Sequence, residues 1–478
     1  MPDAFSYASP LYVLLISPAY AIGCGRMCVY AAQAAAGALV AVMILKLSLE
    51  AGSKLIPATA VALAWVLYSP AAFYELTLLP VVPLALAVSL WSLQAVRAGG
   101  PPKDARSAFA FGIACGVAAG MRPPLLLLGA YPLYIYIRRR RLKPILSSAA
   151  GILLLMLGMS AFHAAQGGDF YPFPRATGVN LVLGHSSGVT GLGPPAPSED
   201  LIETPREDIH QVAARVAADR GYADRVSADR YWTERALRWI LENPGEELSL
   251  LAAKLGGFLG YREFDVYYDT GRARSRDDSL RPLLVPRWGI VLLLALGVPA
   301  FLVAAEGRRA LLLPMGVTLV AALAFVHCER YWLPALPSAL AASGAGLSTV
   351  SRWMRERRWR KAAPVLALSA AIMVPGALWS PAGVPECQYL QGMAARAYNM
   401  GEYSRALVLF ERSALTSPPG SITALYSRYE ALRIARALGM RERAEGHASL
   451  LRELMLEEGI EPPPGVEPDS IDSRSGRN

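Results

Sequence analysis

The sequence predicts an all-α polytopic membrane protein. Two blocks of long apolar stretches, at residues 28–163 and 286–380, flank a polar stretch at 164–285. The chain is 54% hydrophobic and has a mean hydropathy of +0.31, whereas soluble domains are usually more polar. Function is therefore expected at or across a lipid bilayer.

The apolar stretches are long enough for about ten membrane spans, because one span needs about 20 mostly apolar residues. Pro123, Pro124 and Pro132 interrupt the shortest pair of stretches, which can be partly re-entrant. A further apolar stretch at 9–24 contains two Ser-Pro pairs and is predicted as an interfacial helix. The predicted spans lie near 28–47, 55–74, 78–96, 107–121, 124–137, 143–163, 286–305, 309–327, 331–349 and 361–380.

The net charge of +9 is concentrated in alternate loops. The positive-inside rule makes these loops cytoplasmic, so the chain is predicted in the plasma (inner) membrane, with loop 164–285 and the C-terminal domain on the non-cytoplasmic side. Basic runs also occur in nucleic-acid-binding proteins, but here they are interpreted as topology signals and lipid contacts, and no nucleic acid is expected. The basic residues are Lys46, Lys54, Arg97, Lys103, Arg106, Arg138 to Arg141, Lys143, Arg308, Arg309, Arg352, Arg355, Arg357, Arg358, Arg360 and Lys361.

Composition divides the chain into five parts. Residues 1–163 form a first transmembrane block, 164–285 an external loop domain with helical pattern in its second half, and 286–380 a second transmembrane block. Residues 386–458 are predicted to form a small helical domain, and the polar tail at 459–478 to be disordered. In the small domain, Gly401, Ala406, Phe410 and Pro418 have the spacing of one tetratricopeptide repeat.

Three ionisable residues at predicted external ends of spans are candidate site residues. These are Glu75, Arg122 and Arg330, the last in the segment His327-Cys328-Glu329-Arg330-Tyr331. A guanidinium matches the oxygen geometry of a phosphate, so either arginine could bind the phosphate of a lipid-linked donor. The competing interpretation is that each arginine reaches toward lipid headgroups or pairs with a carboxylate such as Glu329.

Weaker candidates lie in the external loop and, for His327, at the end of the predicted span 309–327. His185 and His327 could act in acid–base chemistry, or could be ordinary hydrogen-bonding residues. His185 ends a Gly-rich segment that includes Asn180, and glycines allow close approach of a backbone to a ligand. Lys254, Arg262 and Glu263 bracket a predicted surface helix, and Asp265 to Asp269 are more simply a solvated surface than a metal site. Cys24 and Cys28 lack the companions of a metal site, and no disulfide framework is predicted.

The order of these pieces resembles the GT-C membrane glycosyltransferases, and most closely the bacterial branch related to protein mannosyltransferases and lipid A aminoarabinose transferase. The resemblance covers roughly residues 5–350. Ser9 to Tyr20 is similar to a juxtamembrane "SPLYP" helix, and Gly112 to Pro123 to a Gly-rich helix ending in Arg-Pro. Gly178 to Gly191 is similar to a "GxNxxxGN…G" segment, with His185 where Asn is common. Asn243 to Glu263 is similar to an "NP…K…E" surface helix, and Arg330 to Pro334 to an "RYRLP" motif.

The resemblance implies transfer of a sugar from a polyprenyl-phosphate donor to a protein, lipid or glycan acceptor outside the cytoplasm. It implies Arg122 and Arg330 on the donor-phosphate side, with Glu75, Asn180, His185, Lys254, Glu263 and Tyr331 as further candidates. The family base is expected upstream of Ser9, where only Asp3 is present, so no catalytic residue is assigned. The sequence then predicts either a start upstream of Met1 or impaired catalysis. Metal dependence, sugar, acceptor and oligomeric state stay open.

Two alternatives remain at this stage. A glycan polymerase or ligase also has many spans and a large external loop. A non-catalytic membrane scaffold would instead use residues 386–458 to recruit a protein partner. A transporter is disfavoured because no repeat relates residues 28–163 to 286–380.

Overall fold

The computed structural model is mainly helical in the residues that it describes, and no β-strand occurs among them beyond one isolated bridge between Tyr68 and Val285. The chain divides into two compact units. The first comprises residues 1–195, 225–263 and 270–381, and the second comprises residues 196–224, 264–269 and 382–478. The described residues are 10–97, 104–166, 168, 170–187, 189, 209–261, 263, 285–304, 308–378, 386–399, 401–419 and 421–457.

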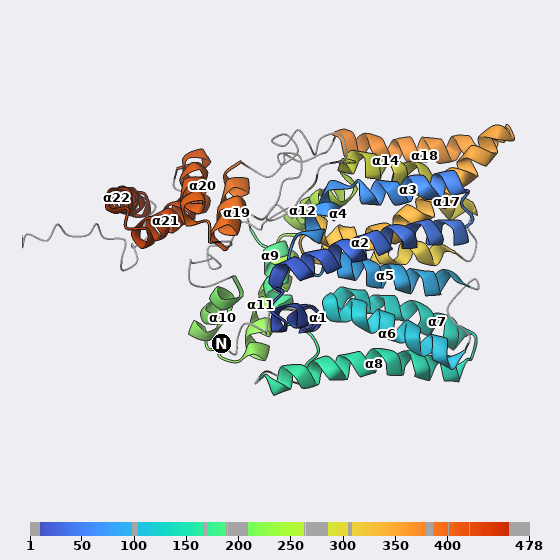
Figure 1. Ribbon diagram of the computed structural model, residues 1–478, viewed down its shortest axis with the longest axis horizontal. Helices are drawn as coiled ribbons and strands as arrows, with labels where there is room; N and C mark the ends of the chain where they lie inside the picture. Colours follow the sequence, from blue (N-terminus) through green and yellow to red (C-terminus); the bar gives the residue numbers. More distant parts are fainter. Residues whose placement is uncertain are drawn as a thin grey trace, which may run out of the picture. The chain divides into compact units, whose positions relative to one another are not determined.

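The first unit is a bundle of long helices with several short ones at one end (Figure 1). Its helices are α1 (Pro10–Ala21), α2 (Gly25–Glu50), α3 (Leu55–Val66), α4 (Ser69–Glu75), α5 (Val81–Val96), α6 (Ala105–Met121), η3 (Pro123–Gly129), α7 (Ala130–Arg138), α8 (Leu142–Ala165), α9 (Thr177–Gly184), α11 (Arg225–Glu242), α12 (Pro244–Leu259), α14 (Arg287–Ala304), η4 (Arg309–Leu312), α15 (Leu313–Ala324), α16 (Glu329–Trp332), η5 (Leu333–Ala335), α17 (Leu336–Arg355) and α18 (Trp359–Leu378).

Three of these helices, α2, α8 and α14, are long and apolar enough to cross a membrane. The remaining predicted spans correspond to shorter apolar helices, to the broken pair η3 and α7, or to α17 and α18. Prolines explain the breaks: Pro123 and Pro124 end α6 and start a 3-10 helix, since proline cannot continue the backbone hydrogen bonding of α6. The stretch predicted at the interface forms α1.

The turns that join α2 to α3, α7 to α8 and α17 to α18 lie together at one end of the bundle (Figure 1). Hydrogen bonds support this placement, because the Ser53 hydroxyl donates to the Gly344 carbonyl at 2.9 Å and the Lys54 amide donates to Ser348 Oγ at 2.8 Å. The basic residues of these turns therefore share one end, which is called the basic end below. Helices α4, α9, α11 and α12 lie at the other end, called the site end.

Close helix packing in the bundle depends on glycine. A Cβ added at Gly112 of α6 would lie 2.1 Å from the Ser148 carbonyl oxygen of α8, and one at Gly120 would lie 2.7 Å from Met159 Sδ. Small residues four apart allow two helix backbones to approach in this way. Gly112 and Gly120 therefore let α6 pack closely against α8 within the chain.

A buried glutamine connects three helices near the site end. Gln33 of α2 is 3% exposed. Its Oε1 accepts a hydrogen bond from the Tyr12 hydroxyl of α1 at 3.0 Å. Its Nε2 donates to the carbonyls of Glu75 and Thr77, at 3.0 and 2.8 Å, and so satisfies groups at the C-terminus of α4. Helix α1 is held against the bundle through this amide.

A disulfide joins Cys24 to Cys28 in the turn between α1 and α2, where Gly23 and Gly25 have positive φ. The sequence predicted no disulfide framework, and this single local bridge was missed. A spacing of four residues at a helix start brings the two Cα atoms to 5.7 Å, within the range of ordinary disulfides.

The second unit contains α10 (Ile209–Asp219) and four further helices, α19 (Glu386–Asn399), α20 (Tyr403–Thr416), α21 (Ile422–Ala437) and α22 (Arg441–Glu457). Ala406 and Phe410 lie in the core of α19 to α22, at 0% and 1% exposure. Gly401 has a φ of +80°, which suits the turn between α19 and α20, because glycine adopts this conformation without a steric penalty.

The packing of α6 on α8 gives a first prediction. Gly112→Ala should lower the free energy of unfolding by about 1–3 kcal/mol, because the added methyl group meets the backbone of Ser148. Gly158→Ala on α8 is the matched control, since a Cβ there has no atom within 4 Å. Alanine favours helix by itself, so the control should be neutral or slightly stabilising. The free energy of unfolding of both variants would be measured in mixed micelles. Equal effects of the two substitutions would contradict the packing described.

Candidate functional site

The candidate site is organised around α16, one helical turn between α15 and α17. Cys328 precedes it in extended conformation, and Pro334 follows in the next 3-10 turn. Within this turn Glu329 and Trp332 are buried, whereas Arg330 and Tyr331 are partly exposed. The turn thus presents one pair of side chains to the core and the other pair to the site end.

Glu329 forms a buried ion pair with Arg287, the first residue of α14. Their side chains are 2% and 0% exposed. The Tyr68 hydroxyl also donates a hydrogen bond to Glu329. The Glu329 carboxylate is therefore shared between Arg287 and Tyr68, a pairing that the sequence did not predict.

Arg287 also completes the end of α12. Its Nε donates to the Gly260 carbonyl at 2.9 Å, and its Nη2 donates to the carbonyls of Gly257 and Phe258 at 3.1 and 2.9 Å. These carbonyls belong to the last turn of α12 and the residue after it, where no helical amide is available. The guanidinium lies 4.4 Å from the centre of the Trp332 ring. One cation therefore holds α12, α14 and α16 together.

Arg122 and Arg330 meet at the ring of Tyr331. The Arg122 guanidinium carbon lies 3.7 Å from the ring centre, and that of Arg330 lies 5.0 Å from it. Arg122 Nη1 donates to the Arg330 carbonyl at 3.2 Å, and Arg330 Nη2 donates to the Tyr331 hydroxyl at 3.2 Å. Arg122 and Arg330, which meet at the Tyr331 ring, are called the arginine pair.

The sequence explains why Arg122 points away from α6. Arg122 is the C-cap residue of α6 and has extended backbone angles, with φ of −151° and ψ of 104°. The residue before a proline avoids helical conformation, and Pro123 follows Arg122 directly. Burial lowers the pKa of Arg122 to about 10, which leaves the guanidinium charged at neutral pH. Tyr74 of α4 interacts electrostatically with Arg122, so the end of α4 lies near the arginine pair.

A second polar cluster consists of Glu247, His185 and Lys254. His185 Nδ1 lies 2.8 Å from Glu247 Oε2, and its Nε2 lies 3.0 Å from Lys254 Nζ. Lys254 also donates to the Leu323 carbonyl at the end of α15, at 3.0 Å. Burial lowers the pKa of Lys254 to about 8, against the opposing effect of Glu247. His185 Nε2 also lies 3.0 Å from the Ala324 carbonyl oxygen, so the imidazole contacts both α12 and the end of α15.

This Glu–His–Lys cluster is buried, with 7%, 3% and 0% exposure. Glu247 and Lys254 share the inner face of α12, because residues seven apart lie two helical turns apart. The sequence identified His185 and Lys254 but missed Glu247, which lies in the first turn of α12. The cluster anchors the segment after α9 to α12 and α15.

The glycines of the Gly-rich segment serve packing in the structure. A Cβ at Gly178 would lie 2.2 Å from the Asp229 carbonyl oxygen of α11, and one at Gly184 would lie 2.4 Å from the Phe325 carbonyl oxygen. The Gly178 amide donates to Asp229 Oδ1 at 2.7 Å. Close approach therefore occurs, as glycine allows, but toward neighbouring protein backbone. Asn180 is half-buried on α9.

The other predicted residues are distributed around this end. Glu75 is half-buried at the end of α4, and its carboxylate lies against Gly37 of α2. Glu263 is partly buried and interacts electrostatically with Tyr68. His327 is fully buried, with its ring 5.5 Å from that of Phe258, so the structure gives it a packing environment. Ser9, Asp3, Arg262 and Asp265 to Asp269 lie outside the described residues.

No family model, curated protein or solved structure matches the chain. Among the described residues, no group of three His, Cys, Asp or Glu side chains is arranged to hold a metal ion. The geometry of the arginine pair and its surroundings is therefore the basis for the proposed function.

Glu75 gives a pH-dependent prediction. Burial raises its pKa to about 7, above the ordinary value of 4.5. Between these two values the folded chain binds more protons than the unfolded chain, so the contribution of Glu75 to stability falls as pH rises. The melting temperature of Glu75→Gln should therefore increase relative to that of the native chain from pH 5 to about pH 7, and the difference should then level off. A difference that is constant from pH 5 to 8 would contradict this environment for Glu75.

Proposed function

We propose that the chain is a membrane glycosyltransferase that takes a sugar from a polyprenyl-phosphate donor, with the donor phosphate bound at the arginine pair. The observation that carries this proposal is the convergence of Arg122 and Arg330, 208 residues apart in sequence, on the ring of Tyr331. Two guanidinium groups at one place favour an anion, and guanidinium groups suit phosphate oxygens in particular.

The surroundings favour an anion that is carried by a lipid. Helices α2, α8 and α14 are apolar and long enough to cross a membrane, and leucines 153, 154 and 157 on α8 are more than half exposed. Such a surface suits acyl or prenyl chains. A polyprenyl phosphate combines an apolar chain with an anionic head, and the arginine pair lies at one end of this apolar bundle.

The chemistry follows from the charges. An acceptor hydroxyl oxygen bonds to the anomeric carbon of the sugar, the bond from that carbon to the phosphate oxygen breaks, and polyprenyl phosphate leaves. Negative charge develops on the leaving phosphate, and fixed cations stabilise it in the transition state. A carboxylate accepts the hydroxyl proton. Glu75 is proposed for this role because it ends α4 directly after Tyr74, which interacts electrostatically with Arg122.

The proposed orientation places the basic end in the cytoplasm of a plasma membrane and the site end outside. The support is that the basic turns of the bundle share one end, as the positive-inside rule requires of a multi-pass protein. The donor would then be used on the non-cytoplasmic side.

A partner-binding role for α19 to α22 is a second proposal, which is compatible with the first. Leu415 and Leu456 are 75% and 58% exposed on these helices, and Ala406 and Phe410 occupy core positions as a tetratricopeptide unit would place them. Stacked helical repeats present an extended surface that suits a protein partner or acceptor.

The test is transfer of radiolabelled sugar from polyprenyl-phosphate donors in membranes that contain the full chain. Arg122→Ala and Arg330→Ala should each lower the rate by about 10²–10³-fold, because each removes one cation from the leaving phosphate. Arg122→Lys should lose less, since the charge stays while the paired hydrogen-bond geometry is lost.

Arg97→Ala is the matched control. Arg97 is an exposed cation after α5, 3.5 Å from Glu50 of α2, and its loss should leave the rate unchanged. Equal rates for the native chain and both alanine variants would overturn the donor site. Absence of transfer from every polyprenyl-phosphate sugar would overturn the proposed function and leave the scaffold role of α19 to α22.

A further inference from the structure

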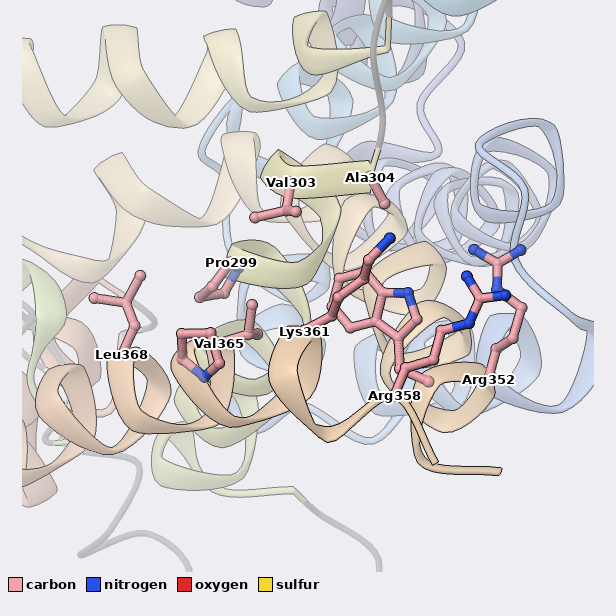
Figure 2. Close-up of a pocket in the computed structure, with 10 residues that line it drawn as sticks. Pro299, Val303, Ala304, Arg352, Arg358, Lys361, Val365 and Leu368 are labelled. Atoms are coloured by element: carbon pink, nitrogen blue, oxygen red, sulfur yellow. The ribbon is translucent and has the colours of Figure 1, made fainter. Parts of the chain in front are cut away.

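A cavity of about 570 Å³ lies between α14, α17 and α18, near the turn between α17 and α18 at the basic end. Its lining has two chemically different sides. Arg352, Arg358 and Lys361 supply three cations on one side, and Pro299, Val303, Val365 and Leu368 form an apolar wall (Figure 2). The cations gather toward one side of the view and Leu368 lies at the opposite side.

The turn between α17 and α18 creates the cationic side. Arg357 has a φ of +55°, and the Arg358 amide donates to the Trp353 carbonyl at 2.8 Å, which closes the last turn of α17. The chain therefore reverses sharply, and Arg358 and Lys361 come to face the cavity together with Arg352 of α17. Glu356 pairs with Arg358 at 2.9 Å, but both side chains are about half exposed, so this pair is weak and readily replaced.

The buried side of the cavity is formed by Trp353. Trp353 is 5% exposed and packs in a cluster with Ala300, Val350, Ala362 and Val365, contributed by α14, α17 and α18. The open rim is apolar: Val303 and Leu368 are 65% and 51% exposed. The site therefore combines a closely packed buried side, a cationic side and an apolar side that continues onto the outer surface of α14 and α18.

These features identify one kind of occupant. A soluble anion would use the three cations and leave the apolar wall exposed. An anionic phospholipid would use both, with its phosphate at the cations and an acyl chain along Val303 and Leu368. Basic pockets between membrane helices on the side of basic loops are typical sites for anionic headgroups.

We propose that this cavity binds an anionic phospholipid of the leaflet at the basic end, with the headgroup phosphate held by Arg352, Arg358 and Lys361. The site is separate from the arginine pair, which lies at the other end of the bundle. The proposal does not depend on the glycosyltransferase proposal, because it requires only that the bundle be inserted in a membrane.

The test measures quenching of tryptophan fluorescence by lipids with brominated acyl chains, using the full chain in nanodiscs. The matrix is phosphatidylcholine, and brominated phosphatidylglycerol or brominated phosphatidylcholine is added at increasing mole fraction. Subtraction of the signal from Trp353→Phe isolates the tryptophan that lines the cavity. Brominated phosphatidylglycerol should quench Trp353 saturably at low mole fraction, whereas brominated phosphatidylcholine should quench weakly and without saturation.

The variant with Arg352→Gln, Arg358→Gln and Lys361→Gln should need at least about tenfold more phosphatidylglycerol for the same quenching. Its matched control changes Arg138, Arg139 and Arg141 to Gln, which removes three cations from the turn between α7 and α8 at the same end. Leu368→Glu should weaken binding as well, because it places a charge on the apolar wall. Five of the six cations in the two triple variants are exposed and Arg141 is partly exposed, so the fold is expected to be retained.

Three results would overturn the proposal. Equal quenching by the two lipids would show that the cavity has no preference for an anionic headgroup. An equal loss in the control triple variant would show general attraction to the membrane surface. Full competition by soluble glycerol phosphate at the same concentration, with no effect of Leu368→Glu, would show a soluble-anion site.

Discussion

The ion pair between Arg287 and Glu329 is the interaction on which the site end depends. Two charges are taken out of water, which is costly unless each is matched by close partners. The carboxylate accepts hydrogen bonds from Arg287 and Tyr68. The guanidinium also donates to three carbonyls at the end of α12 and lies over the Trp332 ring. Removal of either charge would leave the other buried without its counter-ion.

The position of the arginine pair follows from this constraint. Glu329 and Tyr331 belong to the same helical turn, so fixing Glu329 toward the core directs Tyr331 toward Arg122. Arg122 is placed independently, by the Pro-Pro sequence that ends α6. The cationic site is therefore formed by two short, rigid breaks in apolar helices, and neither arginine depends on a long flexible loop for its position.

Local features of this fold could be predicted from sequence. The four-residue spacing of Gly112, Gly116 and Gly120 indicates a close helix contact, and Arg122 before Pro123 indicates a helix end with a charge. Partners distant in sequence could not be predicted in this way. Arg287 could have paired with any carboxylate at its depth, and only the packing of α14 on its neighbours selects Glu329. Glu247 was missed because an acidic residue near a helix start has a sufficient local explanation in the helix dipole.

The two ends of the bundle use charge differently. At the site end, Arg122, Arg287 and Arg330 are partly or fully buried and contact aromatic rings and backbone carbonyls, although α11 also carries exposed arginines such as Arg230. At the basic end cations are numerous and exposed, as around the cavity between α14, α17 and α18. Buried cations have fixed geometry, which suits recognition of one anion, whereas exposed cations suit the diffuse negative potential of a membrane surface.

The most direct test of this account is a double-mutant cycle on Arg287 and Glu329. The free energy of unfolding would be measured in one detergent for Arg287→Met, Glu329→Gln and the double variant. The account predicts that each single substitution costs about 3–5 kcal/mol and that the double variant costs clearly less than their sum, because neither remaining side chain is then an uncompensated buried charge. Additive losses would contradict it, since they would show that the two residues stabilise the fold independently.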